Sequence, residues 1–378
     1  MQYRKALPLK RGSAFLYPAD YQKVAHLCPH GLKKRKNIKN RNLFYASLIH
    51  LLLIIYKIRT FPSSLFKLCG YMKNGNRKFY RGEVTHVYQR AVNGFNIFYQ
   101  LEDYLVFYTI FSVFLRRFKI TAIALCLMID HFHALLICES KVTFSRFIGS
   151  VTSLYSRLFN ATLSRKGQLF DKSYGSAPKI GEKQIRAAIL YVFNNATEKN
   201  ICVDPIDYMW NFLAYMQSDH PFSEKFSHKT ASQKLINARK EVAQAHSADR
   251  WLNYAQLFRL YKGLSLKERQ QLTDFIIVTY LPFDNTRLLS YFKSLEMMKL
   301  AIISNTGSEY SIREEFNPHS DLLYNEIFQF VRESMGVSYK SLLTLPLDEK
   351  ICLANKIAVH THVPYRQIAK FLHIPLKK

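Results

Sequence analysis

The sequence has few cysteines, few acidic residues and no long apolar run. Its six cysteines form no Cys-x-x-Cys pair, which argues against a disulfide scaffold or a structural zinc finger and favours a reducing cytosol. The longest apolar stretch, 43–56, has 14 residues and includes His50, whereas a membrane-spanning helix needs roughly 20. We therefore predict a cytoplasmic protein that does not cross a membrane.

Acidic residues are outnumbered two to one. The chain holds 27 Asp and Glu against 54 Lys and Arg, a formal net charge of +27. Such an excess makes nucleic acid or an anionic membrane the first partners to consider, and charge alone does not choose between them. Hydrophobic residues make up 48% of the 378 residues, which is ample for packed cores.

Residues 1–78 form a zone of unusual composition. Residues 1–71 contain 14 Lys and Arg but one acid, Asp20, and combine a basic run with an apolar stretch without a sustained amphipathic period. Three interpretations stay open: a basic arm that follows phosphates, a signal-like leader, or translated upstream sequence before a true start at Met72. We expect no packed domain here.

Residues 79–217 show a regular pattern of strands and helices. A loop or short strand is expected over 167–178, before the last helix. Strands are expected at 84–91, 120–128 and 131–138, and helices at 100–117, 143–164 (with Thr143 as its cap) and 183–199. This order predicts an α+β domain with a ferredoxin-like antiparallel sheet and covering helices.

The remainder of the chain reads as mostly helical. Residues 218–232 are polar and predict a linker, and 233–378 show helical patterns. Near 349–375, two helices around a turn include the segment RQIAKFLHI, which is typical of part of a helix-turn-helix. A further recognition helix would be expected after this segment, but the chain stops at Lys378. Three interpretations are equally open: the preceding helix reads DNA, the module is incomplete, or the segment is a plain helical bundle.

Two histidines in the third predicted strand are candidates for metal binding. In a strand, His131 and His133 point to one face while Phe132 points to the other. Two neutral imidazoles held in this way can share a divalent cation. The alternative is a pair of structural histidines that are only hydrogen-bonded within the sheet.

Tyr191 and Asn195 lie four residues apart on the predicted helix 183–199, and therefore on one face. A metal held by the two histidines and the amide oxygen would polarise a phosphodiester, and the phenol would attack phosphorus. The alternative makes Tyr191 a core residue and Asn195 a polar end to the helix. Lys183, Arg186 and Lys199 either stabilise the phenolate or form the solvated face of this helix.

The ordered segments GEVTHVYQRAVNG, LCLMIDHFHALLI, YSRLFNATLSRKGQLFDKSY and RAAILYVFNN resemble the HUH-type single-tyrosine transposases, in particular the REP-associated tyrosine transposases. The resemblance implies that His131, His133 and Asn195 bind Mg²⁺ or Mn²⁺. It also implies that Tyr191 cleaves single-stranded DNA beside a hairpin and forms a 5′-phosphotyrosine. A homodimer, in which Tyr191 serves its own metal site or its partner's, is compatible with this family.

The sequence departs from the family pattern at two places. Ile129-Asp130 replaces the usual Pro-Asn before the first histidine, which a turn containing Asp tolerates. Asn195-Ala196 replaces the usual Asn-Pro after the tyrosine, which leaves the end of the helix and the alignment of Asn195 less certain.

Basic residues interleave with aromatic residues after the second histidine. Such a pattern suits single-stranded nucleic acid, because cations bind phosphates and aromatic rings stack on unpaired bases. Tyr155 and Tyr174 are candidates for stacking and are competitors of Tyr191 as nucleophile. The predicted nucleic-acid contacts are Arg146, Arg157, Arg165, Lys166 and Lys172.

The sequence supports three functional hypotheses. The first is a metal-dependent endonuclease and strand transferase acting at hairpin-forming repeats in the nucleoid. The second is a catalytically inactive protein that binds hairpin DNA or RNA. The third is a metal-dependent hydrolase in which Tyr191 has no covalent role, and it is disfavoured because no general base adjoins the histidines.

Overall fold

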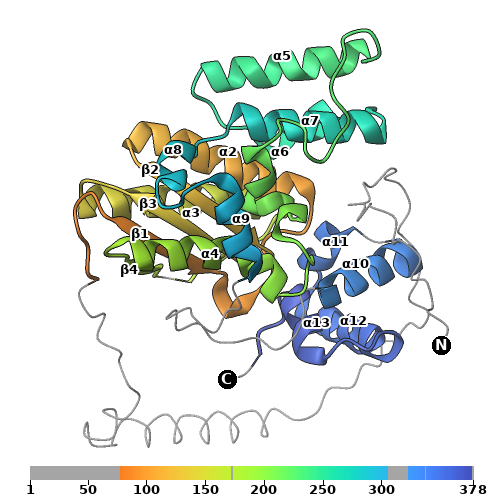
Figure 1. Ribbon diagram of the computed structural model, residues 1–378. Coiled ribbons are helices and arrows are strands. Elements are labelled where there is room, and N and C mark those ends of the chain that lie inside the picture. Colours follow the sequence, from red (N-terminus) through yellow and green to blue (C-terminus); the bar gives the residue numbers. More distant parts are fainter. Residues whose placement is uncertain (1–76, 172, 305–321, 337, 377–378) are drawn as a thin grey trace, which may run out of the picture. The chain divides into compact units, whose positions relative to one another are not determined.

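In the computed structural model, the strands and helices of the described residues all lie in the chain from Lys78 onward (Figure 1). The described residues are 77–171, 173–304, 322–336 and 338–376. The predicted extension 1–78, with its alternative start at Met72, thus lies almost wholly outside them. Within these ranges, no helix has the length and apolar character to span a membrane.

A four-stranded antiparallel sheet forms the core of the region predicted as 79–217. The strands are β1 (Val84–Arg90), β2 (Thr121–Met128), β3 (His131–Ile137) and β4 (Gly175–Pro178). They are arranged in the order β2-β3-β1-β4, which is that of a ferredoxin-like βαββαβ unit. The predicted α+β fold is confirmed, and the segment 167–178 contributes a short edge strand.

The two faces of the sheet are covered by different helices. Phe132 of β3 packs against Phe107 of α2 (Leu101–Phe118), with ring centroids 5.1 Å apart, and Phe107 also contacts Tyr155 of α3 (Lys141–Thr162). His133 points to the opposite face, where it meets α4 (Glu182–Glu198). Helices α2 and α3 therefore cover one face, and α4 covers the face of the histidines.

The start of α3 differs from the prediction. The helix begins at Lys141, because Ser140 is extended and its hydroxyl oxygen accepts a hydrogen bond from the backbone N–H of Thr143 at 3.3 Å. The expected cap at Thr143 was therefore wrong, and Thr143 is the third residue of the helix. Both serine and threonine can cap, so sequence spacing alone did not decide between them.

The chain after α4 is mostly helical, as predicted. Three short 3₁₀ turns, Pro205–Asp207, Met209–Asn211 and Leu213–Met216, precede the helices. The helices are α5 (Gln233–Ser247), α6 (Tyr254–Tyr261), α7 (Leu266–Thr279), α8 (Asn285–Leu289), α9 (Leu295–Ser304), α10 (Leu322–Met335), α11 (Tyr339–Thr344), α12 (Leu347–His360) and α13 (Tyr365–Phe371). The boundaries at 218–232 and 233–378 stay predictions.

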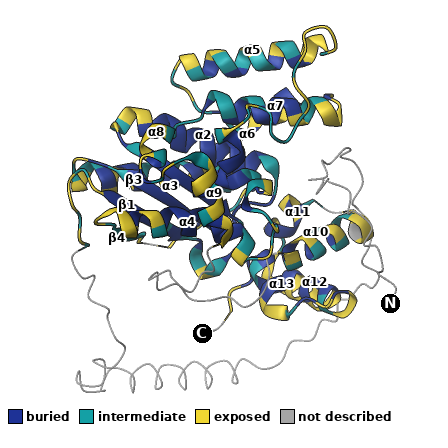
Figure 2. Cartoon of the chain, viewed as in Figure 1, coloured by how far each residue is buried: buried dark blue, intermediate teal, exposed yellow. Residues whose placement is uncertain are grey.

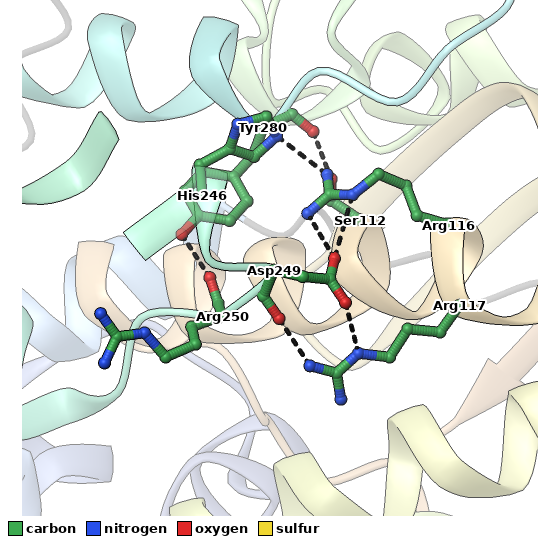
Figure 3. A network of polar contacts seen from close by, with 7 residues as sticks. All are labelled: Ser112, Arg116, Arg117, His246, Asp249, Arg250 and Tyr280. Atoms are coloured by element: carbon green, nitrogen blue, oxygen red, sulfur yellow. Dashed lines mark hydrogen bonds and ion pairs between the residues drawn. The ribbon is translucent and has the colours of Figure 1, made fainter. Parts of the chain in front are cut away.

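Helix α2 is buried along most of its length and contacts the chain segments that follow α5 and α7. Its residues 102–115 are all buried (Figure 2). Near its C-terminal end, Arg116 and Arg117 form ion pairs with Asp249 at 3.0 and 2.6 Å, and Ser112 donates a hydrogen bond to the carbonyl of Tyr280 (Figure 3). These contacts attach the ends of α5 and α7 to the four-stranded sheet through α2.

The C-terminal helices contact the segment that leads into α2. The hydroxyl of Tyr99 donates to the carbonyl of Phe371 at 2.7 Å, and the ring of His373 donates to the carbonyl of Asn96 at 2.7 Å. The neighbouring Ile97 N–H donates to the carbonyl of Ile129, just before β3. Phe371 and His373 therefore contact the segment 96–99, and this segment in turn contacts Ile129, just before the strand that carries the histidines.

Candidate active site

The candidate site lies on the face of the sheet beneath α4. His131 and His133 occupy alternate positions on β3, as predicted, and are 3% and 0% exposed. A third histidine, His86 of β1, shares this face. In the antiparallel register His86 pairs with Leu135 and His133 pairs with Tyr88, so the two histidines are diagonal neighbours on one side of the sheet.

A hydrogen bond joins the two strands through these imidazoles. The Nε2 atom of His86 lies 3.0 Å from the Nδ1 atom of His133. The rings are nearly parallel, with an interplanar angle of 14° and centroids 5.2 Å apart, and His86 is fully buried. The sequence analysis did not identify His86. Its position in the first predicted strand, where it alternates with Tyr88 and Arg90, was the sequence pattern that could have identified it.

His131 has a different partner. Its Nδ1–H donates to Oδ1 of Asp130 at 2.5 Å. Burial alone would raise the pKa of Asp130, but the charge and hydrogen bond of His131, together with Lys370 and Arg90, hold that pKa below its ordinary value. Asp130, expected only as a turn residue, is therefore an ionised partner that fixes the orientation of His131.

Tyr191 lies against the histidines from α4. Its ring meets that of His133 edge-on, at 88° with centroids 5.2 Å apart, and meets His86 at 5.7 Å. Asn195 lies one turn further along α4, where its side-chain amide donates to the carbonyl of Tyr191 at 3.0 Å. The structure thus brings Tyr191 and the histidines together, and it leaves the carbonyl oxygen of the Asn195 side chain as the atom suited to a cation.

His131 and His133 have properties that suit a divalent cation, but they do not supply a complete set of ligands. The Nε2 atom of His131 is buried and makes no hydrogen bond, a costly state that a bound cation would relieve. Burial, with the nearby charges of His131 and Arg90, lowers the pKa of His133 and keeps its ring neutral, as metal binding requires. Within the described ranges, however, no three His, Cys, Asp or Glu side chains are grouped to hold a metal ion. Further ligands would have to be an amide oxygen or water.

Three cations lie near this site. Arg90 and Lys199 are close enough to His133 to lower its pKa, and Lys370 of α13 acts on Asp130 in the same way. The Lys370 side chain passes over Gly94, where an added Cβ would lie 3.3 Å from its Nζ. Lys199 was identified from the sequence, whereas Arg90 and Lys370 were not. Lys370 is far from the histidines in the chain, so no local pattern connects it with the site.

The predicted nucleic-acid contacts lie elsewhere. Arg146 and Arg157 are exposed on α3, which covers the opposite face of the sheet from Tyr191, and Lys166 is exposed in the loop after α3. The guanidinium of Arg165 donates to Oδ1 of Asn160 at 2.7 Å and to the carbonyl of Gln168 at 3.0 Å. Lys172 lies outside the described residues. A role of these residues in binding nucleic acid stays a prediction.

The competing tyrosines are not positioned near the histidines. Tyr155 is fully buried, and its hydroxyl donates to the carbonyl of Ile97 at 2.7 Å, so it is a core residue of α3. The hydroxyl of Tyr174 is 2.8 Å from that of Ser145.

A further tyrosine, Tyr88 of β1, was not predicted from the sequence and lies near the histidines. It is half-buried, and its ring centroid is 6.0 Å from that of His133. Tyr88 therefore competes with Tyr191 as the candidate nucleophile.

The site thus combines an antiparallel ferredoxin-like sheet, two histidines on one strand and a tyrosine on the helix that covers them. Residues 86–195 match the family described as "Transposase IS200 like". A comparison with curated proteins gave no match. Among solved structures, a REP-associated tyrosine transposase bound to a REP hairpin is similar to this chain, with 13% identity and a TM-score of 0.33. The similarity covers 43% of this chain and 98% of the other.

Proposed function

We propose that this protein is a metal-dependent endonuclease and strand transferase that acts on single-stranded DNA beside a hairpin. The observation that carries the proposal is the contact of Tyr191 with His133 and His86 within the segment 86–195 that matches a transposase family. A nucleophile placed beside metal-binding imidazoles is the arrangement that phosphoryl transfer from DNA to protein needs.

The proposed reaction is a transesterification. The phenolic oxygen of Tyr191 attacks phosphorus, the bond from phosphorus to the 3′ oxygen breaks, and the DNA stays attached through a 5′-phosphotyrosine. The phenolic proton leaves to water, and the 3′ oxygen takes up a proton. Because the phosphotyrosine keeps the energy of the broken bond, attack by a 3′ hydroxyl rejoins DNA without ATP.

Different residues would carry out metal binding and stabilisation of the phenolate. His131, His133 and the side-chain oxygen of Asn195 would hold Mg²⁺ or Mn²⁺, which when bound polarises the phosphodiester. An ordinary phenol has a pKa near 10, so its anion needs stabilisation. The positive charges of Arg90 and Lys199, which lower the pKa of His133, would favour both the phenolate and the DNA backbone.

A second function is favoured by one observation. Tyr191 is 6% exposed, so the phenol is not accessible to DNA as the structure stands. A protein that keeps the fold and basic surface but lacks catalysis would bind hairpin DNA or RNA without forming a covalent bond. In that case helices α12 and α13, as a helix-turn-helix that reads DNA, would account for binding.

The test uses the full-length protein with Mn²⁺ and a labelled single strand that carries a hairpin from the repeats flanking its own gene. We expect a protein–DNA adduct that survives denaturation and disappears in Tyr191→Phe and His131→Ala. Tight hairpin binding without an adduct, unaffected by Mn²⁺ and by Tyr191→Phe, would establish the non-catalytic function. Cleavage with free ends that persists in Tyr191→Phe would show a hydrolase.

A further inference from the structure

We propose that His86 is a positioning residue that holds His133 in the tautomer whose Nε2 faces a divalent cation. The inference rests on the proposed function, since it concerns the same metal site. It assigns a role to a residue outside the His-x-His pair, on another strand, through the hydrogen bond between His86 Nε2 and His133 Nδ1.

The Nδ1 atom of His133 is occupied by the hydrogen bond with His86. The ring N–H of one histidine points at the ring nitrogen of the other, at 3.0 Å, so one ring donates and the other accepts, and these two nitrogens do not converge on an ion between them. A neutral imidazole carries one N–H. When Nδ1 of His133 is the donor, its Nε2 keeps the lone pair that a cation needs.

A parallel arrangement is present at His131. There Nδ1–H is held by the carboxylate of Asp130, and Nε2 is the buried atom without a hydrogen bond. The two histidines of β3 are therefore both held at Nδ1, His131 by a carboxylate from the preceding turn and His133 by an imidazole from β1. Such outer partners fix ring orientation and tautomer, and their loss typically weakens metal binding 10- to 100-fold.

The position of His86 is also rigid. His86 is fully buried, and the register of β1 with β3 sets it diagonally across from His133. Its ring also contacts Tyr191 at 5.7 Å, so it is confined between the sheet and α4. A side chain in this position has little freedom to turn, which lets it fix the ring of His133 in one orientation.

The experiment compares Mn²⁺ binding by the full-length protein and its variants, measured by electron paramagnetic resonance of free Mn²⁺. His86→Gln places a carbonyl oxygen near the position of Nε2 and keeps an acceptor, whereas His86→Leu removes it. His373→Leu is the matched control, because His373 is a buried histidine that bonds only a backbone carbonyl in the described contacts. Nitrogen-15 chemical shifts of the imidazoles report the tautomer of His133 without metal.

We expect Mn²⁺ affinity to fall about 10- to 100-fold in His86→Leu and to stay within about threefold in His86→Gln and His373→Leu. We also expect His133 to carry its proton on Nδ1 in the wild type and in His86→Gln, and to become a mixture of tautomers in His86→Leu. Should His86→Leu fail to fold, an Nε2–H tautomer of His133 in the metal-free wild type would overturn the inference.

Two results separate this inference from the proposed function. Wild-type protein that binds Mn²⁺ no more tightly than His86→Leu, with both folded, overturns the role of His86 and leaves the proposed metal chemistry intact. Wild-type protein that binds no Mn²⁺ overturns the metal chemistry and the role of His86 together.

Discussion

The ring of Tyr191 stands edge-on to the imidazole of His133, with an interplanar angle of 88° and centroids 5.2 Å apart. This contact joins α4 to β3 at the point where the proposed nucleophile and the proposed metal ligands meet. Since Tyr191 is 6% exposed, DNA can reach its hydroxyl only if the surrounding side chains move. Substrate binding and local opening at α4 are therefore coupled in the proposed reaction.

The first prediction separates two tyrosines on this face. Tyr191→Phe should abolish the covalent adduct while leaving hairpin affinity within about twofold, because one hydroxyl is lost from a buried ring. Tyr88→Phe is the matched control, since its ring is 6.0 Å from His133, and it should still form the adduct. An adduct that disappears in Tyr88→Phe and persists in Tyr191→Phe would identify Tyr88 as the nucleophile.

The second prediction compares two basic surfaces. Lys370→Gln, near Asp130, should weaken hairpin binding and reduce the slope of log affinity against log salt by about 1, as expected for one lost phosphate contact. Arg157→Gln, on the helix that covers the opposite face, is the comparison. Fluorescence anisotropy at several salt concentrations measures both. A larger effect of Arg157→Gln would place the DNA along α3, as the sequence analysis predicted.

The third prediction concerns the contact between β1 and β4. A Cβ on Gly175 would lie 2.1 Å from Cζ of Tyr88, so Gly175→Ala must displace that ring or the short strand β4. We expect a loss of about 1–3 kcal/mol in the free energy of unfolding, measured in urea. Tyr88→Ala should relieve most of this loss in the double variant. Equal losses from Gly175→Ala with and without Tyr88 would refute the steric cause.

The fourth prediction is a pH dependence from Asp103 at the start of α2. This buried carboxylate accepts hydrogen bonds from the backbone of Tyr99 and Gln100 and from the hydroxyl of Tyr254. Burial is the dominant influence and raises the pKa of Asp103 to about 7. Between about pH 4 and 7 the unfolded state therefore binds fewer protons than the folded state, and the contribution of Asp103 to stability falls as pH rises.

Asp103→Asn, which resembles the protonated acid, should remove that dependence. Three pKa units correspond to about 4 kcal/mol, an upper bound on the change. Urea unfolding of wild type and variant at pH 4.5 and pH 7.5 gives the measurement, because other carboxylates cancel in the difference between the two proteins. A difference that is the same at both pH values would contradict the raised pKa.

Much of the region that carries the candidate site was predictable because its signals are local. Alternation along a strand placed His131 and His133 on one face, and helical spacing placed Tyr191 and Asn195 on one side of α4. The strand and helix order also predicted the ferredoxin-like sheet, which the structure confirms. The cap of α3 was misplaced, because neighbouring serine and threonine compete for the same role.

Other features depended on contacts between distant segments. The sequence shows neither which residue of β1 pairs with Leu135 nor that this register brings His86 to His133. It likewise does not indicate that Lys370 acts on Asp130, because side chains far apart in the chain meet only after the C-terminal helices pack. The exposed cations of α3 matched a pattern for nucleic acid, but the pattern does not specify which face of the sheet the helix covers.

The sequence by itself thus determined the kinds of groups available and the local face on which each lies, because backbone periodicity is a property of a few consecutive residues. The tertiary structure decided which faces oppose one another, since strand register and helix packing are set by the whole core. The site requires both: the His-x-His pair, its neighbour Asp130 and the tyrosine come from local sequence, and the partners His86 and Lys370 come from how the chain folds around them.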